Sequence, residues 1–158
     1  MPGSGKSTLG VVLARRLGYG YLDTDSFISQ REKSTLQGII EKQGLKRFLE
    51  IEKSVGSEIV CDRVIIATGG SMVMSKEAME NLKSIGKVVY INVPVDELKR
   101  RLGNFSDRGI AMSENETLED VLKKRTPYYN KYADITVNYK AGNSLEETVE
   151  DIIKALDL

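Results

Sequence analysis

The first eight residues carry the pattern of a phosphate-binding loop. Gly5, Lys6 and Ser7 match the last three positions of G-x-x-x-x-G-K-[ST], and its first Gly would fall one residue before Met1. In such a loop backbone N–H groups surround a phosphate, the Lys reaches the terminal phosphates and the Ser hydroxyl ligates Mg²⁺. The apolar helical pattern that follows argues against a flexible Gly/Ser leader. The residues expected to bind ATP in this loop are Gly3, Ser4, Gly5, Lys6, Ser7 and Thr8.

Further acidic, glycine and arginine residues follow in a suggestive order. Asp23-Thr24-Asp25 and Thr68-Gly69-Gly70 each come directly after a short apolar run, Asp107-Arg108 lies in a polar stretch, and Arg125-Thr126-Pro127 comes later. A carboxylate at the carboxyl end of a strand can orient a nucleophilic hydroxyl. Arginine can hold a carboxylate in a bidentate pair, and an Arg-bearing loop can close over phosphates. Together these residue types suit phosphoryl transfer to a small acceptor.

Each of these residues also has a simpler explanation. Asp25 could cap a helix that begins near Ser26, and Asp23 could be a solvated turn residue. Gly69 and Gly70 could form only a tight turn. Simple surface charge is the alternative for three arginines, Arg101, Arg108 and Arg125.

Composition excludes several other chemistries. The 158 residues suffice for one domain with its own core. Lys plus Arg and Asp plus Glu number 23 each, so no net basic charge suggests nucleic acid binding. Cys61 is the only cysteine and histidine is absent, which excludes disulfide frameworks, Cys/His zinc sites and a catalytic histidine. No membrane span or signal peptide is visible, so we expect a cytoplasmic protein.

The hydrophobic patterns predict strands that alternate with helices, which is typical of an α/β fold with a parallel sheet. Strands are expected over 19–22, 64–67, 88–93 and 135–138. Helices are expected over 6–17, 26–32, 36–43, 46–61, 76–84, 94–102, 118–132 and 145–156. Pro127 should break or kink its helix. The polar stretch at about 103–116 is expected to be a lid.

In this order the five motifs resemble the shikimate kinase family over essentially the whole chain. The phosphate loop alone is shared by many nucleotide enzymes, whereas the ordered set is much more specific. The resemblance implies a single three-layer α/β/α P-loop kinase domain over 1–158, with family strand order 2-3-1-4-5 and substrate-binding helices at about 26–61. It also implies a monomer of the shikimate pathway of aromatic amino acid biosynthesis. This monomer would use ATP and Mg²⁺ to phosphorylate a ring hydroxyl of shikimate, a small-molecule substrate, without nucleic acid or membrane partners.

The resemblance assigns roles around the phosphates residue by residue. Lys6 and Ser7 match the phosphate and Mg²⁺ positions, and Asp23 matches an acid that helps to hold Mg²⁺ through water. Asp25 matches the residue that hydrogen-bonds the acceptor hydroxyl and is the candidate base. Lys6 and Asp25 are therefore the first two expected catalytic residues.

A second set matches the acceptor and nucleotide sides of the family site. Gly69 and Gly70 match a Gly-rich turn that lets the substrate approach the backbone, and Arg125 matches an Arg that binds the substrate carboxylate. Arg101 matches an Arg that packs near adenine. Arg108 matches the lid Arg and is the third expected catalytic residue.

Several positions depart from the family pattern, all on the acceptor side or in the lid. The Arg of F-R-x-x-E, which helps to hold the shikimate carboxylate, is Leu49, and Arg47 lies about 200° around a helix from that position. Losing such a contact removes roughly 1.5–3 kcal/mol. The third Gly of G-G-G is Ser71, an expected acidic residue is Leu45, and R-P-L in the lid becomes Arg108-Gly109-Ile110.

The strand that normally precedes a phosphate loop is also missing ahead of Met1. A start assigned too late or a trimmed sequence would explain this. Because that strand is central in the family order, its loss would leave unpaired backbone groups between two neighbours. We therefore expect a chain that begins at Met1 to be unstable, or to fill the gap by strand exchange with a partner chain.

Three functions remain open at this stage. The first is a shikimate kinase-like phosphotransferase. The second is a kinase of the same fold with a different acceptor, which Leu49 and Ser71 favour. The third is a degenerate nucleotide-binding homologue without catalysis, which the shortened loop favours. Four retained residues speak against it: Lys6, Asp25, Arg108 and Arg125.

Overall fold

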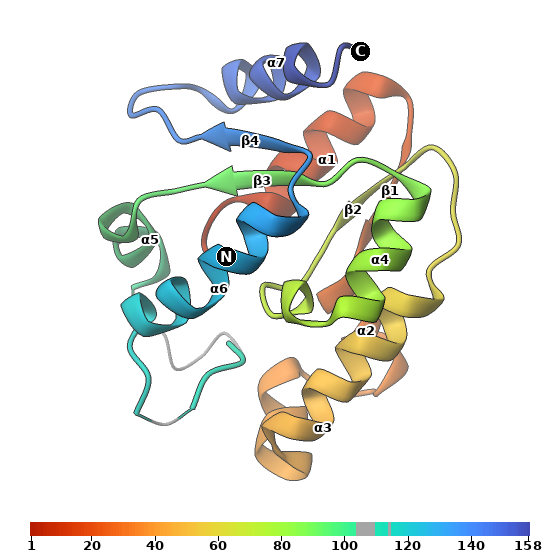
Figure 1. The fold of residues 1–158 in the computed structure, drawn as a ribbon, viewed down its shortest axis with the longest axis vertical. Helices are drawn as coiled ribbons and strands as arrows, with labels where there is room; N and C mark the ends of the chain where they lie inside the picture. Colours follow the sequence, from red (N-terminus) through yellow and green to blue (C-terminus); the bar gives the residue numbers. More distant parts are fainter. Residues whose placement is uncertain (104–109, 114) are drawn as a thin grey trace.

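In a computed structural model, the chain is described over residues 1–103, 110–113 and 115–158. Strands alternate with helices along this part of the chain (Figure 1). The strands are β1 (Gly20–Asp23), β2 (Val64–Ala67), β3 (Val89–Asn92) and β4 (Ile135–Asn138). The helices are α1 (Lys6–Leu17), α2 (Thr24–Arg31), α3 (Leu36–Glu58), α4 (Lys76–Ile85), α5 (Val95–Leu102), α6 (Leu118–Tyr132) and α7 (Leu145–Ala155), with a 3₁₀ turn η1 (Met72–Met74).

The strands form two parallel pairs, which confirms the predicted α/β class. Strand β1 lies beside β2 with Tyr21 opposite Ile65, and β3 lies beside β4 with Ile91 opposite Val137. All four strands fall within a residue of their expected bounds. In the described part of the chain no strand joins β2 to β3.

An apolar cavity of about 570 Å³ separates the two pairs. It is lined by β2 and the start of β3, and helices α1, α4 and α7 contribute apolar side chains such as Leu13, Leu82 and Ile152. This cavity lies where the resemblance places the first family strand. The instability or strand exchange expected for such a chain stays a prediction.

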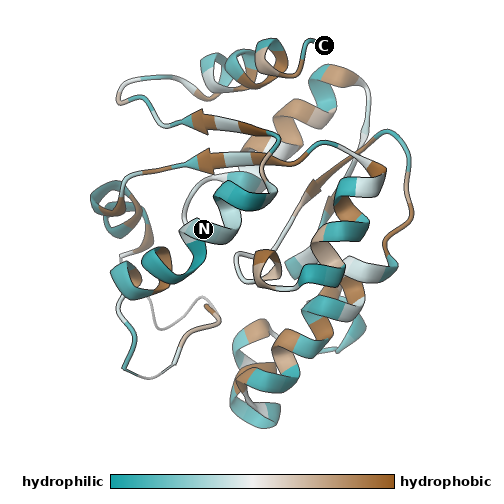
Figure 2. Ribbon diagram, viewed as in Figure 1, coloured by the Kyte–Doolittle hydropathy of each residue, from teal (hydrophilic) through white to brown (hydrophobic). Residues whose placement is uncertain are grey.

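Helices cover both faces of the strands, as expected of three layers. On one face Leu9 and Leu13 of α1 pack with Val149 and Ile152 of α7 against strand residues such as Val137. On the other face η1, α4 and α6 form a second apolar cluster. Figure 1 shows α4 and α6 in front of the strands and α1 behind them, and Figure 2 shows the apolar strands between these helices.

The start of α2 corrects one sequence-based expectation. A helix was expected from Ser26, with Asp25 as a candidate cap, but α2 begins at Thr24 and Asp23 is the capping residue. The Asp23 carboxylate accepts hydrogen bonds from the N–H groups of Asp25 and Ser26 at 3.0 and 3.1 Å. Capping by Asp23 leaves the Asp25 side chain free of that role.

Two further predictions concern interruptions within helices. The two expected helices over 36–43 and 46–61 are confirmed as two segments of α3 separated by a kink at Gly44, whose φ of 84° lies in the left-handed region, and the second segment ends at Glu58. Pro127 does not end α6, which continues to Tyr132. Pro127 and Lys123 are both exposed, so water can reach the Lys123 carbonyl that loses its helical donor.

Candidate active site

The amino-terminal segment forms a tightly curved loop that leads directly into α1. Gly3 and Gly5 have φ values of 74° and 87°, a region that side chains rarely adopt. The Met1 carbonyl accepts hydrogen bonds from Ser4 Oγ at 2.8 Å and Lys6 Nζ at 2.9 Å. Thr8 is exposed in the first turn of α1. This geometry brings the Lys6 ammonium over the loop, beside the positive end of α1.

Two side-chain oxygens of the kind that bind metal ions, one from Ser7 and one from Asp23, lie close together near the start of α1. Ser7 Oγ donates to Asp23 Oδ2 at 2.7 Å, and Tyr21 Oη donates to the same oxygen at 3.2 Å. Burial raises the pKa of Asp23, but hydrogen bonds from Ser7, the Ser26 N–H and Tyr21 outweigh it and lower the pKa overall. Asp23 is therefore held as a carboxylate. Hydroxyl and carboxylate oxygens are the ligands that Mg²⁺ prefers.

The Asp25 carboxylate points into the same region. Its Oδ1 atom is buried and has no hydrogen-bond partner among the described residues. Burial raises the pKa of Asp25. The nearby Lys6 ammonium lowers it and the Asp23 carboxylate raises it, so that overall the pKa of Asp25 lies above its ordinary value. An unpartnered buried acceptor is costly, and such atoms are typical of sites where a ligand supplies the missing partner.

The turn formed by Gly69 and Gly70 after β2, here called the glycine turn, packs against these residues. The Gly69 N–H donates to Thr24 Oγ1 at 2.9 Å, and a Cβ at position 69 would lie 2.6 Å from Asp25 Oδ1. Tyr129 Oη donates to the Gly70 carbonyl at 2.6 Å, which joins the turn to α6. Glycine at 69 is thus required by close approach.

Arg125 comes to this turn from the buried side of α6. It is only 3% exposed, and its Nη1 atom would lie 3.1 Å from a Cβ at Gly70. Its Nη2 atom donates to the Ala111 carbonyl. The structure therefore brings Asp25, Arg125 and the phosphate loop together.

Lys6 has charged neighbours from three elements. Burial lowers the pKa of Lys6. The carboxylates of Asp25 and Asp23 raise it and Arg125 lowers it, so that overall the pKa lies below its ordinary value. A triphosphate in the loop would add negative charge beside this ammonium and so favour its charged form.

Arg101 stands on the other side of the loop. It donates to the Gly3 carbonyl at 3.4 Å and to Glu97 at 2.6 Å, and its guanidinium lies 4.9 Å from the centroid of the Tyr139 ring. Arg101 thus offers a flat cationic surface beside the phosphate loop. Arg108 and much of the expected lid lie outside the described residues, so both stay predictions.

Two residues of the candidate site, Glu52 and Tyr129, were assigned no role from the sequence alone. Glu52 is buried on α3 and accepts a hydrogen bond from Ser71 Oγ, and Tyr129 fixes the glycine turn. The sequence does contain a signal for Glu52: it is a charged residue between Phe48 and Val55 on the apolar side of its helix, which indicates a buried carboxyl group. No local pattern shows that positions 52 and 71 meet.

A phosphate loop, an acidic pair and buried arginine define a P-loop phosphotransferase site, and comparisons with known proteins specify the family. The family model described as "Shikimate kinase" matches residues 2–157. Shikimate kinase from Nostoc sp. is 34% identical over 160 residues, with 99% of this chain and 87% of that protein covered. Shikimate kinase from Rippkaea orientalis is 35% identical over 159 residues, covering 99% and 84%.

Solved structures agree with the sequence comparisons. Shikimate kinase from Acinetobacter baumannii in complex with shikimate superimposes with a TM-score of 0.89 at 31% identity, covering 99% of this chain and 89% of that one. The enzyme from Bacteroides thetaiotaomicron gives a TM-score of 0.83 at 28% identity, covering 99% and 94%. The chain belongs to the shikimate kinase family. No helix in the described residues is long and apolar enough to cross a membrane.

Proposed function

We propose that this protein transfers the γ-phosphoryl group of ATP to a ring hydroxyl of shikimate and forms shikimate 3-phosphate. The observation that carries the proposal is the unpartnered Asp25 Oδ1, which faces the region between Lys6, the glycine turn and Arg125. We also expect the protein to act as a cytoplasmic monomer, as the family resemblance implies.

The amino-terminal residues fit a magnesium–nucleotide complex. The positive φ values of Gly3 and Gly5 shape a cradle of backbone N–H groups, and Lys6 supplies a cation beside it. Ser7 and Asp23 present two oxygens 2.7 Å apart, which suits Mg²⁺ because this ion keeps several of its waters. Bound Mg-ATP would supply the phosphoryl group and neutralise charge on it. Arg101 would pack against the adenine ring of the nucleotide.

Asp25 and Arg125 are assigned to the acceptor. Arg125 would pair with the acceptor carboxylate and so fix the direction of the ring. Asp25 Oδ1 would accept the hydrogen bond of the reacting hydroxyl and take its proton as the bond from oxygen to phosphorus forms and the bond to ADP breaks. Lys6 and Arg108 would stabilise the charge of the transferring group.

The direct test is ADP release from Mg-ATP with and without shikimate. We expect shikimate-dependent turnover in the intact protein and its loss in Lys6→Met. Nucleotide binding is measured in parallel by calorimetry. Binding of Mg-ATP without turnover of any acceptor would instead identify a non-catalytic homologue.

A different acceptor is the second candidate, because position 49 offers no cation. Leu49 packs against the apolar cluster of Phe48 and Ile39, and Arg47 is half-exposed and pairs with Glu50 at 3.4 Å. Turnover of another hydroxy acid in preference to shikimate would support this candidate. Under the main proposal, Leu49→Arg lowers the KM for shikimate by about tenfold, because it restores a charge-assisted contact.

A further inference from the structure

Glu52 is a buried carboxyl group directly behind the proposed base. It lies on α3, is 2% exposed, and accepts a hydrogen bond from Ser71 Oγ through Oε2. Its Oε1 atom points the other way, toward Gly69. Burial of a carboxyl group at this depth requires a partner for each oxygen.

Gly69 brings the carboxyl groups of Glu52 and Asp25 together. A Cβ at Gly69 would lie 2.2 Å from Glu52 Oε1 and 2.6 Å from Asp25 Oδ1, so these two oxygens are at most about 4.8 Å apart. Two ionised carboxylates this close repel each other. A proton on one of them removes the repulsion and makes that oxygen a possible hydrogen-bond donor to the other.

Burial is the main reason why Glu52 favours its protonated form, and its charged neighbours act in opposite directions. Asp25 on α2 opposes ionisation of Glu52, Arg125 on α6 favours it, and the phenol of Tyr129 lies on the same side. Among the described residues no salt bridge reaches Glu52, and Arg125 donates to the Ala111 carbonyl. Burial outweighs the hydrogen bond from Ser71 and raises the pKa of Glu52 to about 7.

We propose that Glu52 is a positioning residue that works as a neutral acid: its O–H donates to Asp25 Oδ1, and Ser71 holds its other oxygen. This inference rests on the proposed function only in naming Asp25 as the base. A carboxylate oxygen has two lone pairs, so Oδ1 keeps one for the acceptor hydroxyl. Glu52 thus fixes the direction of Asp25 without adding a second negative charge beside the phosphoryl group.

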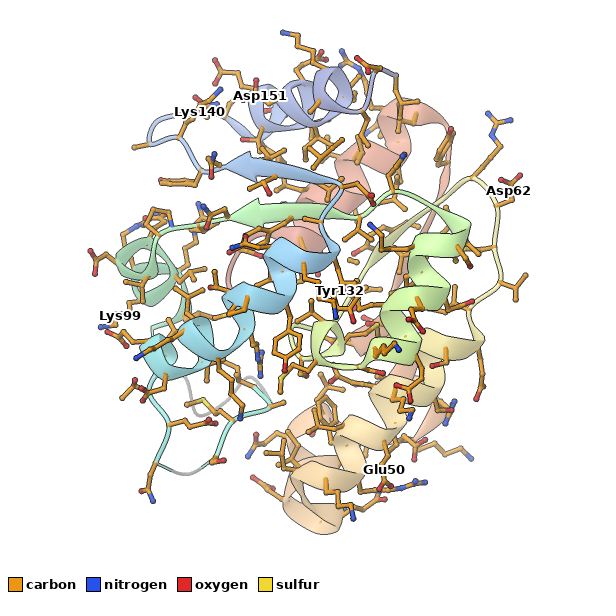
Figure 3. All side chains as sticks on the ribbon, viewed as in Figure 1. Glu50, Asp62, Lys99, Tyr132, Lys140 and Asp151 are labelled. Atoms are coloured by element: carbon orange, nitrogen blue, oxygen red, sulfur yellow. The ribbon has the colours of Figure 1, made fainter. Side chains whose placement is uncertain are left out.

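Infrared difference spectroscopy tests the protonation of Glu52 without any turnover. The spectrum of the intact protein minus that of Glu52→Gln should show the C=O stretch of a carboxylic acid at pH 6, and the band should fade as pH rises through about 7. Glu50, labelled in Figure 3, lies on the same helix with its side chain 51% exposed. Glu50→Gln is the control: it retains Glu52, so its difference spectrum should lack the band. Absence of the band at pH 6 would overturn the proposal.

Ser71→Ala gives a second spectroscopic reading. Because the Ser71 hydroxyl lowers the pKa of Glu52, its removal should move the loss of the band to higher pH. A band that disappears at the same pH in both proteins would show that Ser71 does not hold the Glu52 carboxyl.

Kinetics separate a neutral Glu52, which donates a hydrogen bond, from an ionised Glu52, which can only accept one. A Gln amide can donate to Asp25 as the acid does, so kcat of Glu52→Gln should exceed that of Glu52→Ala by about tenfold, with KM for ATP alike in both. Above about pH 7 kcat should fall in the intact protein and stay level in Glu52→Gln. Equal impairment of the two variants would contradict the proposal. If the band is present but shikimate is not phosphorylated, the proposed function fails and the Glu52 assignment stands.

Discussion

Asp25 is the single residue on which the proposed chemistry depends most directly. Replacing it by Asn keeps the size of the side chain and removes the base. We expect kcat to fall by about 10²–10⁴-fold, the range that a positioned general base contributes, while Mg-ATP binding is retained. Steady-state turnover with shikimate, together with calorimetric titration of nucleotide, measures both effects.

Asp62 provides the matched control for that substitution. It is exposed in the segment before β2, and Figure 3 shows it at the edge of the molecule. Asp62→Asn should leave kcat unchanged. An unchanged rate in Asp25→Asn as well would remove Asp25 as the base.

Glu52 should make stability depend on pH in a defined direction. Burial raises its pKa in the folded protein from 4.5 to about 7, so the folded state binds a proton that the unfolded state releases in this range. Its contribution is therefore complete below about pH 4.5 and is lost as pH rises to about 7, at a cost on the order of 3 kcal/mol.

Urea unfolding of the intact protein and of Glu52→Gln at pH 4.5 and pH 8 measures this effect. The variant should gain stability relative to the intact protein as pH rises, and Glu50→Gln should show no such trend. A difference that does not change with pH would show that folding does not raise the pKa of Glu52.

Sequence reasoning at the residue scale succeeds where a motif is local. The phosphate loop and the Asp23-Thr24-Asp25 turn are short patterns, and the structure brings them together with Arg125, as the order of motifs indicates. The contact of Glu52 with Ser71 joins positions 19 residues apart on two elements. Only the packing of α3 against the turn after β2 creates it, so no spacing could predict it.

The turn between β2 and η1 is the element that holds the acceptor side together. A Cβ at Gly69 would meet the oxygens of Glu52 and Asp25 at 2.2 and 2.6 Å, distances that force these side chains to move. Gly69→Ala should therefore destabilise the protein by about 1–3 kcal/mol and reduce kcat, because it displaces Asp25.

Gly86 is the control for a glycine at the end of an element. A Cβ there has open space around it and its φ is extended, so Gly86→Ala should leave both quantities unchanged. Thermal unfolding of the two variants measures the change in stability, and their turnover with shikimate measures the change in kcat. Wild-type activity in Gly69→Ala would show that the turn can move without consequence.

Element types were easier to predict than element ends. The apolar run Val64–Ala67 and the helical spacing after the phosphate loop give strand β2 and helix α1 correctly. The start of α2 depended on whether Asp23 or Asp25 caps it, and the spacing of the sequence does not distinguish two caps that are two residues apart. Pro127 was expected to interrupt α6, but its exposed position lets solvent satisfy the freed carbonyl.

At the scale of the whole molecule, the cavity between β2 and β3 is the dominant feature. Two strand edges face it, and the cores on both faces of the strands depend on what lies between them. The Met1 amine is also buried beside Lys6 and Arg125, and burial, Lys6 and Arg125 all lower its pKa well below the usual value. The strand edges around this cavity have no backbone partners among the described residues, which should make the packing on both faces of the strands less stable.

An added strand tests this argument. Joining Val-Ile-Leu-Ile-Gly to Met1 converts the buried amine into an amide and offers apolar side chains and backbone partners to β2 and β3. Each of the four large apolar side chains contributes about 1.5–3 kcal/mol on burial, against a chain entropy of about 1–2 kcal/mol for each of the five residues, so we expect a net gain of about 1–2 kcal/mol. The corresponding rise in Tm is roughly 2–8 °C.

An extension of five Ser and Gly residues is the control. It also converts the Met1 amine into an amide but does not fill the cavity, so its Tm should rise less. Equal Tm values for the two extensions would mean that the cavity does not limit the stability of this fold.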